Sequence, residues 1–219
     1  PHTHHTHTTR LSRSRRCPPP HPNPGKEKKF TFDYSYDSFV PRDDSRYASQ
    51  EVVWNDIGEG VLHNAWNGYN CSLFAYGQTG SGKSYSMMGY GEDKGIIPMA
   101  CERIFDRVEK SKEDSSLTIK VEVSMLEIYM EKIRDLFNPV KGRDLKVRNN
   151  PKTGFYVDNL TSSLCGSYDD ITDLMDMGTA ARTVASTNMN ATSSRAHTVF
   201  QIKLTQTKFD RDTSMVTDK

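Results

Sequence analysis

The sequence has few of the features that mark secreted, membrane-spanning or nucleic-acid-binding chains. Its four cysteines, Cys17, Cys71, Cys101 and Cys165, are far apart and form no C-x-x-C pair, which excludes an obvious zinc site or disulfide framework. Unpaired thiols are typical of a reducing, intracellular compartment. No apolar run approaches the ~18 residues of a membrane span, and no signal-peptide core is present at the N-terminus. The net charge of +1 argues against a dedicated nucleic-acid binder.

Residues 1–29 differ in composition from the rest of the chain. PHTHHTHTTRLSRSRR is His/Thr/Arg/Ser low complexity, and CPPPHPNPG is proline-rich. Neither stretch holds enough apolar surface to offset its ordering entropy, so we expect residues 1–29 to be disordered. The histidines there have no cysteine or carboxylate partners, so no metal site is predicted. The chain also begins with Pro1 rather than Met, which indicates a fragment.

A phosphate-binding loop is the strongest motif in the sequence. The segment 77–84, GQTGSGKS, matches G-x-x-x-x-G-K-[ST] and directly follows an apolar run, Leu73–Tyr76, that is typical of a buried strand. Glycines let backbone N–H groups point inward at a phosphate chain, where side chains would block its approach. Lys83 is expected to reach the β- and γ-phosphates and the Ser84 hydroxyl to ligate Mg²⁺. The predicted binding residues are Gly77, Gln78, Thr79, Gly80, Ser81, Gly82, Lys83 and Ser84.

The remaining pattern predicts an α/β fold. Helices are expected from Ser49, as its N-cap, through Val53, Ile57, Val61 and Ala65, and then over 99–110, 127–137 and 171–187. Strands are expected over 30–36, 117–125 and 200–204, with a strand-like stretch over 144–160 that turns at Pro151–Gly154. Helix, strand, glycine loop and helix in that order are the core of a P-loop NTPase fold.

The segment 188–197, NMNATSSRAH, is rich in short polar side chains. Hydroxyl and amide groups with one cation can together reach a γ-phosphate, a Mg²⁺ ion and an attacking water. The same composition is typical of a solvated loop, and composition alone leaves both interpretations open. The candidate residues are Asn190, Thr192, Ser193, Ser194 and Arg195.

Two motifs in this order, FAYGQTGSGKSYSMMG and NxxSSRxH, resemble the phosphate-binding loop and switch I of the kinesin motor domain. The resemblance runs from about Phe30 to the end of the chain. It is closest to the kinesin-3 subfamily in FDYSYDS, GIIPMACERIF, MLEIYMEKIRDLFNP and LKVRNNPKTGFYVDNL. It implies a partial motor domain over residues 30–219, with a mixed, largely parallel central sheet flanked by helices. It also implies ATP and Mg²⁺ as cofactors, microtubules as the partner, and a place in the cytoplasm on the cytoskeleton.

The resemblance also implies a role for each matching residue. Tyr85 occupies the adenine-stacking position, and Ser84 and Ser194 would ligate Mg²⁺ directly or through water. Asn190 and Ser193 would sense the γ-phosphate and order the attacking water. Arg195 would form the switch I half of an ion pair with a switch II glutamate. The expected tubulin contacts are Lys146, Arg148 and Lys152.

Two departures from the family pattern qualify the expected activity. Ala196 stands where kinesins usually have serine, and no D-x-x-G-x-E switch II motif occurs in the 219 residues. We therefore expect an ATP-driven microtubule motor whose 219 residues alone do not move. The alternative is a non-motile head that binds nucleotide or tubulin without cycling. A small GTPase or P-loop kinase is disfavoured, because no N-K-x-D guanine motif is present. Direction, cargo and oligomeric state are not encoded in this segment.

Overall fold

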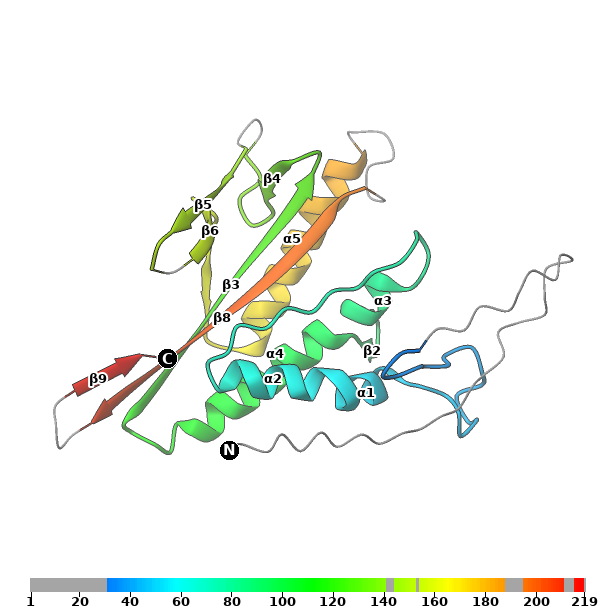
Figure 1. Cartoon of the computed structure of the whole chain (residues 1–219), viewed down its shortest axis with the longest axis horizontal. Helices are drawn as coiled ribbons and strands as arrows, with labels where there is room; N and C mark the ends of the chain where they lie inside the picture. The colour runs from blue at the N-terminus through cyan, green and yellow to red at the C-terminus, as the bar shows by residue number, and fades with distance from the viewer. Residues whose placement is uncertain (1–30, 141–143, 153, 188–194, 211–214, 219) are drawn as a thin grey trace, which may run out of the picture. The chain divides into compact units, whose positions relative to one another are not determined.

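The computed structural model of the chain describes residues 31–140, 144–152, 154–187, 195–210 and 215–218. It divides into two units, residues 1–35 and 36–219, and every helix and strand below belongs to the second (Figure 1). In the first unit, residues 31–35 form no strand and Phe32 is 74% exposed, so the half-buried strand predicted from Phe30 is wrong for these residues. Alternation marks a possible face, but a strand also needs a neighbour to take its hydrogen bonds.

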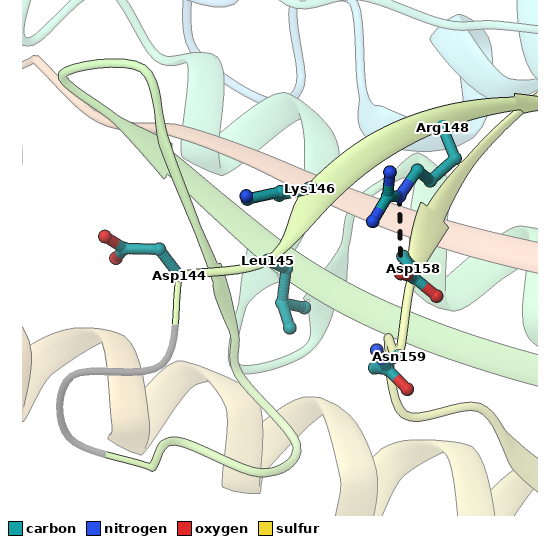
Figure 2. Close-up of a pocket in the computed structure, with 6 residues that line it drawn as sticks. All are labelled: Asp144, Leu145, Lys146, Arg148, Asp158 and Asn159. Carbon is teal, nitrogen blue, oxygen red and sulfur yellow. Dashed lines mark hydrogen bonds and ion pairs between the residues drawn. The ribbon is translucent and has the colours of Figure 1, made fainter.

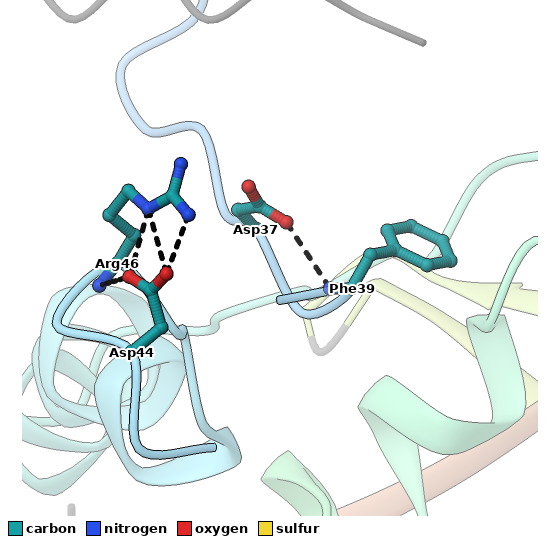
Figure 3. Close-up of polar contacts among 4 residues, drawn as sticks. All are labelled: Asp37, Phe39, Asp44 and Arg46. Atoms are coloured by element: carbon teal, nitrogen blue, oxygen red, sulfur yellow. Dashed lines mark hydrogen bonds and ion pairs between the residues drawn. The ribbon is translucent and has the colours of Figure 1, made fainter. Parts of the chain in front are cut away.

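A polar loop leads into the first helix. The Asp37 carboxylate accepts a hydrogen bond from the Phe39 amide at 3.2 Å, and Asp44 accepts from the Arg46 amide at 2.9 Å and from Arg46 Nε at 2.8 Å (Figure 3). An aspartate that bonds to a backbone N–H two residues further along holds a tight turn without help from a regular element.

The helix predicted from Ser49 is present in three parts, α1 (Gln50–Val53), the π-helical turn η1 (Trp54–Gly58) and α2 (Glu59–Trp66). Ser49 Oγ accepts from the Val52 amide at 3.3 Å, which confirms the N-cap. The buried stripe is Trp54, Gly58 and Leu62, one residue away from the predicted Val53, Ile57 and Val61. Both sets repeat every four residues. The large indole is the one buried, because it lies against the bare backbone of Gly58.

Short elements connect this helix to the main sheet. The glycine loop leads into α3 (Lys83–Met87), an antiparallel hairpin of β1 (Gly89–Tyr90) and β2 (Asp93–Lys94), and α4 (Ile96–Ser111). The hairpin was not predicted, since its glycine-rich, charged sequence is also typical of an irregular connection. Pro98 lies in the first turn of α4, where its missing N–H costs no helical hydrogen bond.

Strand β3 (Leu117–Tyr129) is the centre of the five-stranded sheet. Along Leu117–Ile128 it pairs antiparallel with β8 (His197–Asp210). It also pairs with β4 (Lys132–Asp135) and β7 (Ser163–Cys165), and β9 (Met215–Asp218) pairs with β8. β5 (Lys146–Asn150) and β6 (Gly154–Asp158) form a separate hairpin, which confirms the turn predicted at 151–154.

The helical stretch predicted over 127–137 is wrong. These residues form the end of β3, a tight turn and β4, with Met130 and Glu131 at φ +47° and +60°. Apolar residues in this stretch fit either a helical or a strand pattern. A strand forms here because β3 already pairs with β8, and the end of β3 also hydrogen-bonds to β4.

The strand directions differ from those of the mixed, largely parallel sheet that the resemblance implies. Every strand ladder in the described residues is antiparallel, and residues 71–76, predicted to be a buried strand, belong to no ladder. Phe74 is 86% exposed and Tyr76 is fully exposed. Apolar content predicted burial, but Leu73 alone in this apolar run is half-buried against the main core, and the run pairs with no strand among the described residues.

The main hydrophobic core lies between one face of the sheet and the helices. Val121, Val123 and Met125 of β3 share a cluster with Ile104 of α4 and Ile171 of α5 (Tyr168–Thr187). α5 runs alongside β3 and β8 (Figure 1). On the other face, Leu126, Ile133 and Leu145 form a smaller core near the β5–β6 hairpin. In the described part of the chain, no helix is both long enough and apolar enough to cross a bilayer.

Candidate functional site

The glycine loop 77–84 has backbone conformations and close contacts that favour glycine over other residues. Gly80 and Gly82 have φ values of +82° and +86°, in the left-handed region that side chains disfavour. A Cβ on Gly77 would lie 2.4 Å from Ser81 Oγ, so this position also has no room for a side chain. The Ser81 amide closes a turn onto the Gln78 carbonyl at 3.2 Å. The loop is therefore a curled backbone of the kind that can surround a phosphate.

Lys83 lies over this loop. It is the first residue of α3, and its Nζ donates to the carbonyl oxygens of Gly77 at 2.8 Å and Gln78 at 2.7 Å. The loop itself therefore holds the ammonium group, which places a positive charge among the backbone groups of 77–82. Ser84 follows on α3 and is exposed. The helix expected directly after the glycine loop is present and begins at Lys83.

Tyr85 is fixed by three residues that sequence reasoning did not select. Gln50 Nε2 donates to the Tyr85 carbonyl at 2.5 Å, and the Tyr85 hydroxyl donates to Asp93 Oδ2 at 3.3 Å. Arg42 pairs with the same Asp93 carboxylate. Burial of the ring, with the Asp93 carboxylate as the next cause, raises the pKa of the Tyr85 phenol. Gln50 is 35 residues away in sequence, so no local pattern links it to the loop.

The switch I candidates are only partly described. Asn190, Thr192, Ser193 and Ser194 lie outside the described residues. Arg195 is exposed in a turn that ends two residues before β8 begins at His197, and Ala196 is half-buried. Among the described residues, no hydrogen bond or ion pair joins Arg195 to residues 77–85.

The candidate tubulin contacts gather on the β5–β6 hairpin. Lys146 and Arg148 are exposed on β5, and Lys152 is exposed in the turn that follows. Arg148 Nε lies 3.4 Å from Asp158 Oδ2 on the paired strand, so Asp158 offsets part of its charge. Lys146 and Arg148 line a hollow of about 190 Å³ together with Asp144, Leu145, Asp158 and Asn159. Figure 2 shows these six side chains.

The donor set near the loop fits Mg²⁺ held with a nucleotide rather than by the protein alone. In the described ranges, no cluster of three or more His, Cys, Asp or Glu residues could hold a metal ion. Mg²⁺ in nucleotide sites takes most of its ligands from phosphate oxygens and water, and needs few from the protein. The Ser84 hydroxyl, one residue after Lys83, supplies a suitable oxygen.

Comparison with known proteins identifies the family. The kinesin motor domain model matches residues 4–218. Kinesin-related protein 1 of Dictyostelium discoideum is 55% identical over 85% of this chain, which spans 9% of that protein. Kinesin-like protein KIF1A of Rattus norvegicus is 51% identical over 85% of this chain, which spans 11% of it. The likeness to kinesin-3 proteins expected from the sequence is therefore confirmed.

Solved structures agree. A KIF14 segment with ADP, in complex with a microtubule, superposes with a TM-score of 0.76 at 42% identity, over 87% of this chain and 54% of that one. The α/β P-loop class predicted from the sequence is thus confirmed, although the chain covers only about half the length of that solved structure. The family match over residues 4–218 and the shared fold establish that the chain belongs to the kinesin motor domain family.

Proposed function

We propose that this chain is the nucleotide-binding part of an ATP-driven microtubule motor. The observation that carries the proposal is the loop 77–84, whose glycines curl the backbone while Lys83 Nζ lies on its carbonyls. A phosphate chain entering this loop would meet backbone N–H groups and one ammonium group. Charge-assisted contacts of this kind are about twice as strong as neutral ones.

The residues act on the nucleotide in distinct ways. Lys83 exchanges its two carbonyl partners for β- and γ-phosphate oxygens, and Tyr85, fixed by Gln50 and Asp93, supplies a ring for the adenine base. Ser84 and Ser194 would hold Mg²⁺, which would supply positive charge to offset that of the phosphates during transfer. Asn190 and Ser193 orient the attacking water. Losing one such preorganised contact commonly lowers the rate about a hundredfold.

The partner we propose is the microtubule. The KIF14 segment is described in complex with a microtubule, and the β5–β6 hairpin of this chain presents Lys146, Arg148 and Lys152 to solvent. Exposed cations on a rigid two-stranded hairpin suit an acidic protein surface, where they speed encounter more than they add affinity. Such a motor works in the cytoplasm on the microtubule cytoskeleton.

A non-motile head is the second candidate, and one observation favours it. Ala196 lacks the hydroxyl that kinesins usually carry beside the switch histidine. A head of this kind would bind nucleotide or tubulin without sustained turnover.

Phosphate release after rapid mixing with ATP and microtubules separates the two candidates. For a motor that carries this chain together with a switch II segment, we expect microtubules to raise the release rate at least tenfold. Lys83→Met should abolish that stimulation. The matched control is Lys110→Met on the exposed face of α4, which should leave the rate unchanged. Tight ATP binding without stimulated release would support the non-motile head instead.

A further inference from the structure

A buried carboxylate, Glu127, lies where β3, β8 and α5 meet. Glu127 is 4% exposed and belongs to β3. Its Oε1 lies 3.9 Å from Arg182 Nε on α5, and the Arg182 side chain is 33% exposed. An ionised carboxylate is costly to bury unless a cation or hydrogen-bond donors compensate it. The residues around Glu127 must therefore compensate its negative charge.

The neighbouring strands supply the rest of this environment. The register places Thr198 of β8 directly opposite Glu127 on one side and Arg134 of β4 opposite it on the other. Directly opposite side chains have Cβ atoms about 5 Å apart and share a face of the sheet. Thr198 Oγ1 is buried and has no hydrogen-bond partner among the residues that the structure describes. Glu127 thus pairs with a cation on the helix and lies opposite the first residues of β8 in the sheet.

The packing of α5 on β3 explains why Arg182 meets Glu127. A Cβ on Gly178 would lie 2.4 Å from Met125 Sδ, so the helix backbone lies against the Met125 side chain that rises from β3 at this point. Four residues of helix advance about 6 Å and two residues of strand about 6.6 Å. The rise of the helix therefore matches that of the strand between the Gly178–Met125 contact and the Arg182–Glu127 pair, so the same packing of α5 on β3 brings Arg182 to Glu127.

This position in the fold suggests a specific role. α5 ends at Thr187, five residues after Arg182, and β8 begins at His197, one residue before Thr198. The pair and the register thus connect both described ends of the stretch that carries the switch I candidates. We propose that Glu127 is a positioning residue. Through its ion pair with Arg182 on α5 and the pairing of its own strand with β8, it fixes the separation between the last turns of α5 and the start of β8, and with it the place of Arg195.

The anchoring of α5 and β8 does not depend on the proposed function. Its consequence does rest on that function: fixing the end of α5 and the start of β8 favours recognition of a γ-phosphate. Native-state hydrogen exchange tests the anchoring itself. In Glu127→Gln and in Arg182→Gln we expect amides of residues 183–187 and 197–199 to exchange at least tenfold faster. The double variant should be no worse than the poorer single variant, because the two residues act as one pair. Residues 100–108 of α4 provide the internal reference.

Thr198→Val is the matched control at the same place, because it keeps the side-chain shape and the Glu127–Arg182 pair while removing the unpartnered hydroxyl. It should not speed exchange at 183–187. Uniformly faster exchange that includes α4 would show a general loss of stability, and unchanged exchange in both charge variants would show no anchoring. Either result overturns the proposal.

A second measurement on the same variants connects anchoring to function. The dissociation constants of ADP and of a non-hydrolysable ATP analogue are measured with Mg²⁺. Glu127→Gln should leave ADP affinity within about twofold and weaken the analogue at least fivefold, because only the analogue has a γ-phosphate. A purely structural role would lower both equally and refute the positioning role. A wild-type chain that binds neither nucleotide would refute the proposed function, while the exchange experiment would still decide the anchoring.

Discussion

At the scale of single residues, the sharpest constraint in the first helix is the contact between Trp54 and Gly58. The indole is 1% exposed, and a Cβ on Gly58 would lie 2.3 Å from its Cε3 atom. Gly60, two residues further on in α2, has nothing within 4 Å of the same virtual atom. Packing against Trp54 therefore requires a glycine at position 58, whereas no contact requires one at position 60.

This difference predicts opposite effects from one substitution. Gly58→Ala should destabilise the fold by about 2 kcal/mol, because the methyl group must displace a buried ring. Gly60→Ala should stabilise it by about 0.5–1 kcal/mol, because alanine loses less backbone entropy in a helix. Urea denaturation of the two variants measures both free energies of unfolding. A Gly58→Ala protein as stable as the wild type would contradict the packing described for Trp54.

At the scale of elements, the start of α5 is held by a reciprocal cap. Ser167 Oγ accepts from the Asp170 amide at 3.1 Å, and Asp170 Oδ2 accepts from the Gly166 and Ser167 amides at 2.7 and 3.0 Å. Such a capping box satisfies backbone donors that a helix start leaves without partners. The Gly166 amide, followed by the Ser167 hydroxyl, holds the pKa of Asp170 below its usual value.

The depressed pKa gives the cap a pH dependence. Because the folded pKa of Asp170 lies below its unfolded value, its contribution is present above the unfolded pKa of about 4 and is lost as pH falls through the folded pKa. Asp170→Asn should therefore lower the melting temperature at pH 7, and the difference from wild type should shrink toward pH 3. Asp169→Asn, in the same first turn, is the control and should show a smaller effect at pH 7. Equal effects of the two substitutions would rule out the cap.

Local signals were sufficient to predict several elements. Ser49 marked a helix start, strict alternation marked β3, and Pro151–Gly154 marked the turn between β5 and β6, because each of these features acts on neighbouring residues. Residues 127–137 were predicted wrongly, since their apolar spacing fits two structures and only pairing with β4 and β8 selects one. The same limit applied to Gln50 and Asp93, which reach Tyr85 across the fold.

At the scale of the whole molecule, the sequence predicted the family and the glycine loop but not the strand pairing. Phe74 and Tyr76 alternate with smaller residues as a strand would, yet residues 71–76 pair with no strand in the part of the chain that the structure describes. Burial of such a segment depends on partners supplied by other parts of the fold. The loop at 77–84 is predictable because its geometry depends on its own glycines and on Lys83.

Equilibrium binding of a fluorescent ATP analogue in Mg²⁺ tests the central claim most directly, with wild type, Lys83→Met and Lys110→Met compared by titration. Charge-assisted hydrogen bonds contribute about 1.5–3 kcal/mol each. The account therefore predicts saturable binding by the wild type, at least tenfold weaker binding by Lys83→Met, and an affinity within about twofold of wild type for Lys110→Met. Equal affinities in all three folded proteins, or no saturable binding by the wild type, would contradict it.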